Sequence, residues 1–379
     1  MKLIRHTPRN AASNDERSNA RSDARSDARC KPRYNAAYAK IVRKRRITCV
    51  ISAIIMVILA GISLGCGSSG LDVPTVLAAL TFQAPEYAQT VVWSLRMPHV
   101  LCAIIGGITL AAAGCAYQSS LRNPLASAST LGIAQGAAFG ASIAIIVLGA
   151  GNTSTHDGVT FTNPYITALC AFIGASLSSV VIYVLSRVRE LTAESVVLCG
   201  VALSALFAGS TALVQYFADD TQVAAVVFWM FGSLRRVSYN EVALMGIIAV
   251  ICCIFFFFQR WKCNALEAGE GCAHALGINV GRTRIALLIM ASLGSSIIIA
   301  FCGTINFIGL VAPHIMRRII GSDYRSLFVC SALVGACLLQ ISDLIAANTI
   351  PSVVLPISSI TSFIGAPLFI FLLLKRSKR

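Results

Sequence analysis

Long, uninterrupted apolar runs recur along this chain, and they restrict it to a small set of folds. Two of them read VALMGIIAVICCIFFFF (242–258) and IALLIMASLGSSIIIAFC (285–302). Such runs can cross the roughly 30 Å hydrocarbon core of a bilayer as helices, whereas membrane β-strands alternate over about ten residues. With 56% hydrophobic and only 12% charged residues, the sequence predicts an all-α polytopic membrane protein.

The apolar runs predict about ten transmembrane helices. They fall at residues 47–67, 98–118, 124–150, 163–186, 191–217, 240–259, 284–302, 304–320, 327–346 and 356–374. Basic residues gather at alternate ends of these spans, which places the N- and C-termini in the cytoplasm. The outer loops then keep only Arg96, Arg235 and Arg236. We therefore expect a multi-pass protein of the plasma (cell inner) membrane.

The N-terminal segment carries most of the charge. Residues 1–46 hold 14 of the 31 lysines and arginines but four of the 16 acidic residues, which gives +10 of the total +15. Positive charge beside a first span sets topology and needs no nucleic acid as a partner. The repeat RSNA-RSDA-RSDA-R (17–29) has nothing to bury. We expect residues 1–46 to form a disordered, basic cytoplasmic tail that can contact anionic lipid, followed by a membrane domain, residues 47–379.

Motifs for catalysis and phosphate binding are absent from the sequence. There is no GxxxxGK[ST] or HExxH, and most of the 14 cysteines lie inside apolar runs, as small hydrophobic residues do. We expect no catalytic residue, no metal site and no bound cofactor. Asp343 is the clearest ionisable residue within a span, so an ion-coupled secondary transporter is one alternative and a structural carboxylate another. A membrane-embedded enzyme using His314, Cys302 or Asp343 would need two polar groups at one depth.

One polar segment, LEAGEGCAHALGINVGR (266–282), separates two apolar runs within a cytoplasmic loop of about 260–284. Residues 267–277 predict a short helix, because Glu270 favours a helix N-terminus and Gly277 suits the left-handed position after a helix. Ala273 and Leu276 would share one face of it. The spacing Glu270, Ala273, Gly277 (E-x-x-A-x-x-x-G) is that of the loop by which permeases dock onto ATPases. The segment predicts contact with a soluble cytoplasmic partner.

Three further stretches resemble the ordered motifs of the FecCD permeases. They are SLRMPHVLCAIIGGITLAAAGCAYQSSLRNPLASASTLGIAQGAAFG (94–140), GTINFIGLVAPHIMRRIIGSDYR (303–325) and VLPISSITSFIGAPLFIFLLLK (354–375). The resemblance runs from about residue 47 to the C-terminus. It implies the ten-span fold of the cobalamin-importer permease, the transmembrane subunit of a type II ABC importer. Its cargo would be an iron–siderophore complex first, with haem or cobalamin next.

The resemblance also implies partners and residue roles. A second permease subunit, identical or different, a pair of ABC ATPase subunits carrying ATP and Mg²⁺, and an external substrate-binding protein would complete the importer. Residues 267–277 would be the coupling helix, with Glu270, Ala273, Leu276 and Gly277 at the ATPase. In the family's R-x-P-R motif Arg96 is kept, but His99 replaces the second arginine that docks the binding protein; Arg235 and Arg236 could compensate.

The remaining motif residues have structural interpretations beside functional ones. Asn123 and Pro124 would end one helix and start the next, and Gly309 and Pro313 would interrupt a short span. His314 and Arg317 would share a cytoplasmic helix face that contacts either the ATPase or lipid headgroups. The glycines at 132, 136 and 140 predict a smooth helix face for close packing, within the chain or against another helix.

Overall fold

The first helix of the protein extends well beyond the first membrane span. The computed structural model describes residues 11–66, 71–154, 158–161, 163–188, 193–350 and 353–374, and the chain divides into two compact units, Met1–Thr48 and Cys49–Arg379. Helix α1 (Ala11–Gly65) includes most of the segment 1–46, for which the sequence predicted disorder. Alanine, arginine and lysine are strong helix formers, so this backbone can be helical without a hydrophobic face. Residues 1–10 lie outside the described residues.

Seven helices within the described residues are long and apolar enough to cross a membrane, which confirms a multi-pass membrane protein. They are Tyr38–Gly65 of α1; Glu86–Ser120, which contains α3 (Glu86–Thr90), the π-helical turn η1 (Val91–Arg96) and α4 (Met97–Ser120); α6 (Pro164–Val188); α7 (Ala193–Tyr216); α9 (Tyr239–Ala268); α11 (Val280–Cys302); and α13 (Tyr324–Asn348). Six of them begin within a few residues of a predicted span or include one, and Tyr38–Gly65 overlaps the first predicted span, 47–67. Uniform apolarity over about 20 residues is a strong signal.

The other three predicted spans correspond to shorter helices. They are α5 (Ile133–Ser142), which continues into the π-helical turn η2 (Ile143–Val147), α12 (Ile308–Ile320) and α14 (Ile357–Leu374). At 1.5 Å per residue, α12 is only about 20 Å long.

The prediction that a helix starts at Pro124 was wrong. Residues 121–132 form turns, in which the Leu125 N–H donates to Asn123 Oδ1 at 2.9 Å and the Ser127 N–H donates to Thr130 Oγ1 at 2.9 Å. Such local side-chain bonds compete with helix formation.

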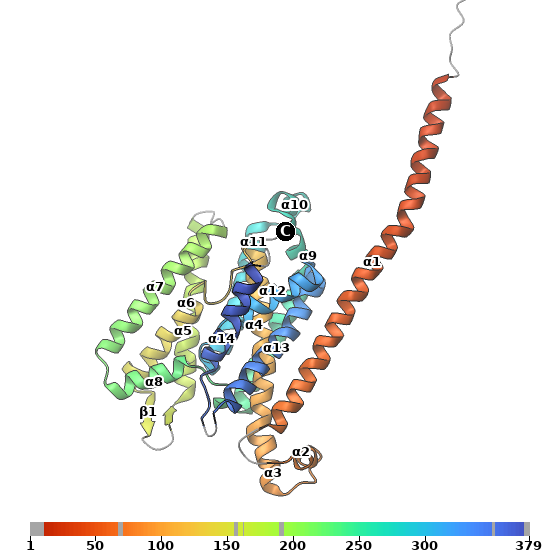
Figure 1. Cartoon of the computed structure of the whole chain (residues 1–379). Coiled ribbons are helices and arrows are strands. Elements are labelled where there is room, and N and C mark those ends of the chain that lie inside the picture. Colours follow the sequence, from red (N-terminus) through yellow and green to blue (C-terminus); the bar gives the residue numbers. More distant parts are fainter. Residues whose placement is uncertain are drawn as a thin grey trace, which may run out of the picture. The chain divides into compact units, whose positions relative to one another are not determined.

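The two ends of the second unit carry different short elements (Figure 1). Helix α10 (Glu270–Ala275) lies at one end, and α2 (Val73–Leu80), α3, α8 (Asp220–Met230) and an antiparallel hairpin lie at the other. The hairpin pairs β1 (Gly151–Ser154) with β2 (Gly158–Phe161). The sequence had predicted helices and loops only; this glycine- and threonine-rich stretch has β-branched residues and no helical periodicity, which favours paired strands. We call these the α10 end and the α8 end.

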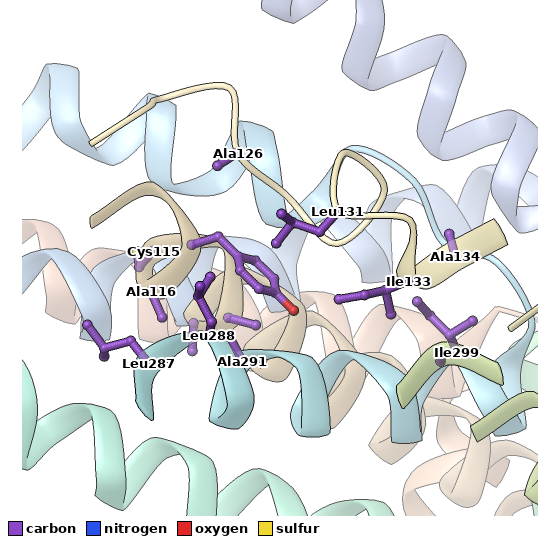
Figure 2. Close-up of a cluster of buried hydrophobic side chains, with 14 of the residues drawn as sticks. Cys115, Ala116, Ala126, Leu131, Ile133, Ala134, Leu287, Leu288, Ala291 and Ile299 are labelled. Atoms are coloured by element: carbon purple, nitrogen blue, oxygen red, sulfur yellow. The ribbon is translucent and has the colours of Figure 1, made fainter. Parts of the chain in front are cut away.

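A large buried cluster joins α4, α5 and α11 (Figure 2). Leu287, Leu288 and Ala291 of α11 lie against Cys115 and Ala116 of α4, and the segment before α5 covers them from the other side. That segment contributes Ala126 and Leu131. The turn after Asn123 therefore belongs to the core.

Glycines let several of these helices touch backbone to backbone. A Cβ at Gly114 of α4 would lie 1.8 Å from the Gly309 carbonyl oxygen of α12. Pro313 has no N–H to bind that carbonyl four residues earlier, so the freed oxygen of Gly309 packs at Gly114. Helix α12 is continuous through Gly309 and Pro313, so the predicted interruption is absent.

The predicted glycine face of α5 packs within the chain. Gly136 meets Gly174 of α6, where a Cβ would lie 2.4 Å from the Gly174 oxygen, and Gly140 meets Cys170 in the same way. Gly132 instead has φ 78° and precedes the helix as its N-cap.

Candidate functional site

The predicted polar helix exists but is shorter than residues 267–277. It covers Glu270–Ala275, and Glu267 belongs to the last turn of α9. Gly269, with φ 122°, separates the two helices, and Gly277, with φ 74°, takes the left-handed position that the sequence predicted. Both angles favour glycine, because a Cβ is strained there. Two glycines therefore set the bounds of α10.

The side chains of this segment do not all face the same way. Ala273 is fully buried against the chain itself, so the prediction that it faces the partner together with Leu276 was wrong. Leu276 is 66% exposed, and Cys272, His274 and Gly277 are exposed as well. The surface available to a partner is therefore a small knob formed by the last turn of α10 and Leu276.

Glu270 is held from the neighbouring helix. Its Oε1 lies 2.5 Å from Nη2 of Arg284 in α11, and the Arg284 Nε donates to the Ser120 carbonyl oxygen of α4 at 3.0 Å. Asn279 caps the start of α11 by accepting from the Arg282 N–H at 2.9 Å. Neither Asn279 nor Arg284 was among the site residues predicted from the sequence; an asparagine just before a helical run is the signal that could have identified Asn279.

Glu267 is held by an arginine of a different helix, α12. Its Oε1 lies 2.8 Å from Nη1 of Arg317 in α12. Arg317 also donates through Nη2 to the Tyr324 hydroxyl at 3.0 Å and to Gln118 Oε1 of α4 at 3.4 Å. Arg317 therefore binds inside the protein, where the sequence predicted contact with an ATPase or with lipid.

His314 does not share the environment predicted for it. It is 6% exposed, and its ring lies edge-on to Phe369 of α14 with 5.6 Å between the ring centroids. The side chain is packed against α14 and is not presented to solvent.

A carboxylate fixes the turn between α12 and α13. Asp323 accepts from Asn264 Nδ2 at 3.0 Å and from Arg325 Nη2 at 2.8 Å. Burial opposes the ionisation of Asp323, but the hydrogen bonds from Arg325 and Asn264 outweigh it, so the pKa of this carboxyl lies well below its ordinary value. The Tyr324 N–H donates to Asn264 Oδ1 at 2.8 Å. These bonds connect α13 to the end of α9 just before α10.

At the α8 end, two of the four predicted docking residues are buried. Arg96 is 7% exposed and donates to the carbonyl oxygens of Leu64 and Gly65, at the end of α1. His99 Nε2 lies 2.8 Å from Asp343 Oδ1, and both side chains are less than a tenth exposed. Asp343 therefore has a partner that the sequence did not reveal, and His99 is turned into the protein rather than toward a docking protein.

Arg235 and Arg236, in the 3₁₀ turn η3 (Leu234–Arg236), are exposed at the same end. Arg236 Nη2 donates to the Phe228 carbonyl oxygen near the end of α8, at 2.8 Å. Of the four residues, these two present positive charge to solvent.

A cavity of about 550 Å³, lined by both polar and apolar side chains, lies between α5, α8, α14 and the segment before α12. Its lining includes Ser129, Gln135, Thr304, Asn306, Ser358 and Ser362. Hydroxyl and amide groups of this kind can contact a polar cargo without binding it tightly. Among the described residues, no three His, Cys, Asp or Glu side chains gather as a metal site requires.

Known proteins resemble this chain over most of its length. Residues 54–375 match the FecCD transport family. A protein of Methanocaldococcus jannaschii described as an ABC transporter permease is 45% identical over 90% of this chain and 98% of its own length. The hemin transport permease of Yersinia pestis is 32% identical over 86% and 95%. The vitamin B12 import permease of Vibrio cholerae is 36% identical over 76% and 83%.

A solved structure has the same arrangement of helices. It is a transporter described as of the metal-chelate ABC type, in an inward-facing conformation. Its chain matches with a TM-score of 0.76 at 28% sequence identity, and the match covers 86% of this chain and 98% of that one.

Proposed function

Because the chain belongs to the FecCD transport family of ABC transporter permeases, we propose that it forms the translocation pathway of an importer of iron–siderophore complexes. As a family member it is the permease subunit of a type II ABC importer for iron chelates, haem or cobalamin. Relatives named for iron chelates and for ferric citrate favour the siderophore. Haem and cobalamin come next.

The topology that fits this role has ten membrane helices, with both termini and the α10 end in the cytoplasm. The ten would be the seven long helices together with α5, α12 and α14. Support comes from Arg284, Arg317 and Arg325, which lie at the α10 end, as the positive-inside rule requires. The basic tail, residues 1–46, would then be cytoplasmic and close to the lipid surface.

The two ends would serve different partners. An ABC ATPase would bind α10 and Leu276. The observation that most favours this function is that a six-residue helix presents an exposed leucine on the polar face of a membrane protein, as a docking knob requires. Arg235 and Arg236 would meet the external binding protein at the α8 end.

The remaining partners follow from the same role. A second permease subunit, identical or different, would face α7, whose Leu206 and Leu213 are exposed. ATP and Mg²⁺ would bind the ATPase, and this chain would hold no cofactor of its own and contact no nucleic acid.

The ion-coupled alternative has lost its main support. It relied on Asp343 as a carboxylate within a span, but Asp343 is bound by His99 inside the protein. A buried His–Asp pair that joins α4 to α13 can have a structural role, which needs no ion gradient.

The docking knob can be tested by one substitution. Leu276→Asp should abolish copurification of the ATPase from crosslinked membranes, because it places a charge in the apolar centre of the contact. Leu77→Asp, in α2 at the α8 end, is the matched control, since Leu77 is 60% exposed. Mass spectrometry should identify a partner with a GxxxxGK[ST] motif in the wild type and in the control only. Retention of that partner by Leu276→Asp would refute the assignment.

The cargo can be assigned by uptake. Cells lacking the gene and complemented with it would be given radioiron-loaded siderophore, labelled haem or labelled cobalamin in turn. Siderophore uptake that requires the gene supports the proposal. Uptake restricted to haem or cobalamin would reassign the cargo and leave the importer function in place.

A further inference from the structure

Two arginines connect residues 267–277, which we call the coupling segment, to helix α4 of the membrane domain. Arg284 binds Glu270 and the Ser120 carbonyl of α4. Arg317 binds Glu267 and Gln118 of α4. They come from different helices, α11 and α12, and contact the first residue of α10 and the last turn of α9 respectively. Each therefore bridges one glutamate beside the ATPase contact to the last turn of α4.

The geometry points to Arg284 and Arg317 as positioning residues that transmit movement of α10 to α4 during transport. This inference deepens the proposed function and rests on it. Neither guanidinium is available to a partner, since their side chains are 11% and 18% exposed. Glu270 and Glu267 are 50% and 33% exposed, so water screens each pair from the glutamate side only. Positive groups also suit the C-terminus of α4, where carbonyls lack helical partners.

Helix α4 is built to carry a displacement. It runs between the two ends of the second unit (Figure 1), and most of its residues are buried. Glycine contacts fix it to two neighbours: Gly114 meets Gly309 of α12, and a Cβ at Gly107 would lie 2.5 Å from the Gly335 oxygen of α13. Close-packed interiors move as units. A push on α10 therefore moves α4 with α12 and α13.

The far end of α4 is also fixed to its surroundings. His99 contacts Asp343 near the C-terminal end of α13, and Arg96, just before α4, donates to the Leu64 carbonyl oxygen at the C-terminal end of α1. Arg235 and Arg236 lie at the same end of the protein. The chain of contacts from Glu267 and Glu270 through α4 thus reaches the α8 end, where the binding protein would dock.

The test compares transport with ATP hydrolysis in the assembled importer. The permease would be reconstituted in proteoliposomes with its ATPase and binding protein. The amount of radioiron-loaded siderophore (or of labelled haem or cobalamin, if the uptake test assigns one of these) moved per ATP would be measured for Arg284→Gln and Arg317→Gln. Each should assemble and hydrolyse ATP but move about fivefold less cargo per ATP, the lower range of allosteric coupling. Arg325→Gln is the matched control: it breaks an ion pair of 2.8 Å at the same end, to Asp323 rather than to the coupling segment.

A charge exchange separates transmission from simple loss of structure. Glu267→Arg combined with Arg317→Glu should recover most of the ratio lost by Arg317→Gln. If Arg317→Gln does not assemble, Arg317→Lys takes its place, because lysine keeps the charge but cannot bind Glu267 and Gln118 with one planar group.

The outcomes distinguish this inference from the function on which it rests. An unchanged ratio in both arginine variants, or an equal loss in Arg325→Gln, would overturn the inference while the importer stands. Failure of the wild-type permease to assemble with any ATPase would overturn the proposed function itself.

Discussion

The contact between Gly114 and Gly309 gives a sharp prediction for stability. A Cβ at Gly114 would lie 1.8 Å from a backbone oxygen, 1.6 Å short of the 3.4 Å at which ordinary contact begins. A backbone atom cannot rotate away as a side chain can, so α4 and α12 must separate. Overpacking of this kind costs about 1–3 kcal/mol or more. Gly114→Ala should therefore lower the free energy of unfolding by at least that amount.

A graded series makes the reasoning testable. At Gly309 a Cβ would lie 2.7 Å from the Leu110 oxygen, which needs only 0.7 Å of movement, and at Gly246 the nearest atom is a side-chain carbon at 3.5 Å. Gly61 has nothing within 4 Å, so Gly61→Ala reports only the gain in helix propensity, up to about 1 kcal/mol. The loss of stability should decrease in the order Gly114, Gly309, Gly246, Gly61.

Reversible unfolding of the purified chain in lipid–detergent micelles would measure the series. Transport need not be assayed, so the result does not depend on the cargo. A Gly114→Ala variant as stable as Gly61→Ala would show that α4 and α12 do not approach at their backbones.

Three other predictions concern charged side chains. His99→Ala should cost about 3–5 kcal/mol, because it leaves Asp343 buried without its partner; adding Asp343→Asn should recover part of the loss in the same unfolding assay, and no recovery would contradict the pairing. Arg235→Glu should slow association with the binding protein, and the effect should be smaller at high salt. Surface plasmon resonance at two ionic strengths would measure it. The control, Arg325→Glu at the α10 end, should leave the association rate unchanged. Asp323→Asn should lower the thermal midpoint at pH 7. Because the folded pKa of Asp323 is depressed, its contribution is present above the ordinary carboxyl pKa and should shrink only as the pH falls below about 4; a difference from wild type that persists unchanged in acid would contradict it.

Much of the site's location was predictable because its signals are local. The sequence predicted a left-handed backbone conformation at Gly277, and the structure has it. The residue type and its place after a helix decide the backbone angle there. The short helix was predicted for the same reason, although Gly269 begins it later than expected. The turn after Asn123 was missed, since hydrogen bonds among Asn123, Ser127 and Thr130 replace the helix that an apolar run suggests.

The sequence by itself determined the class of protein, most of its membrane helices and the position of the segment between α9 and α11, since hydrophobicity, charge and glycine act over one or two helical turns. Only the tertiary structure decided which way each polar side chain points. It buried Ala273, paired His99 with Asp343 and brought Arg284 to Ser120. Helices that are apolar all round carry no stripe in their sequence to fix their rotation. Their rotation is set by the glycine contacts and core packing between helices far apart in the chain, and so are the partners of their polar side chains.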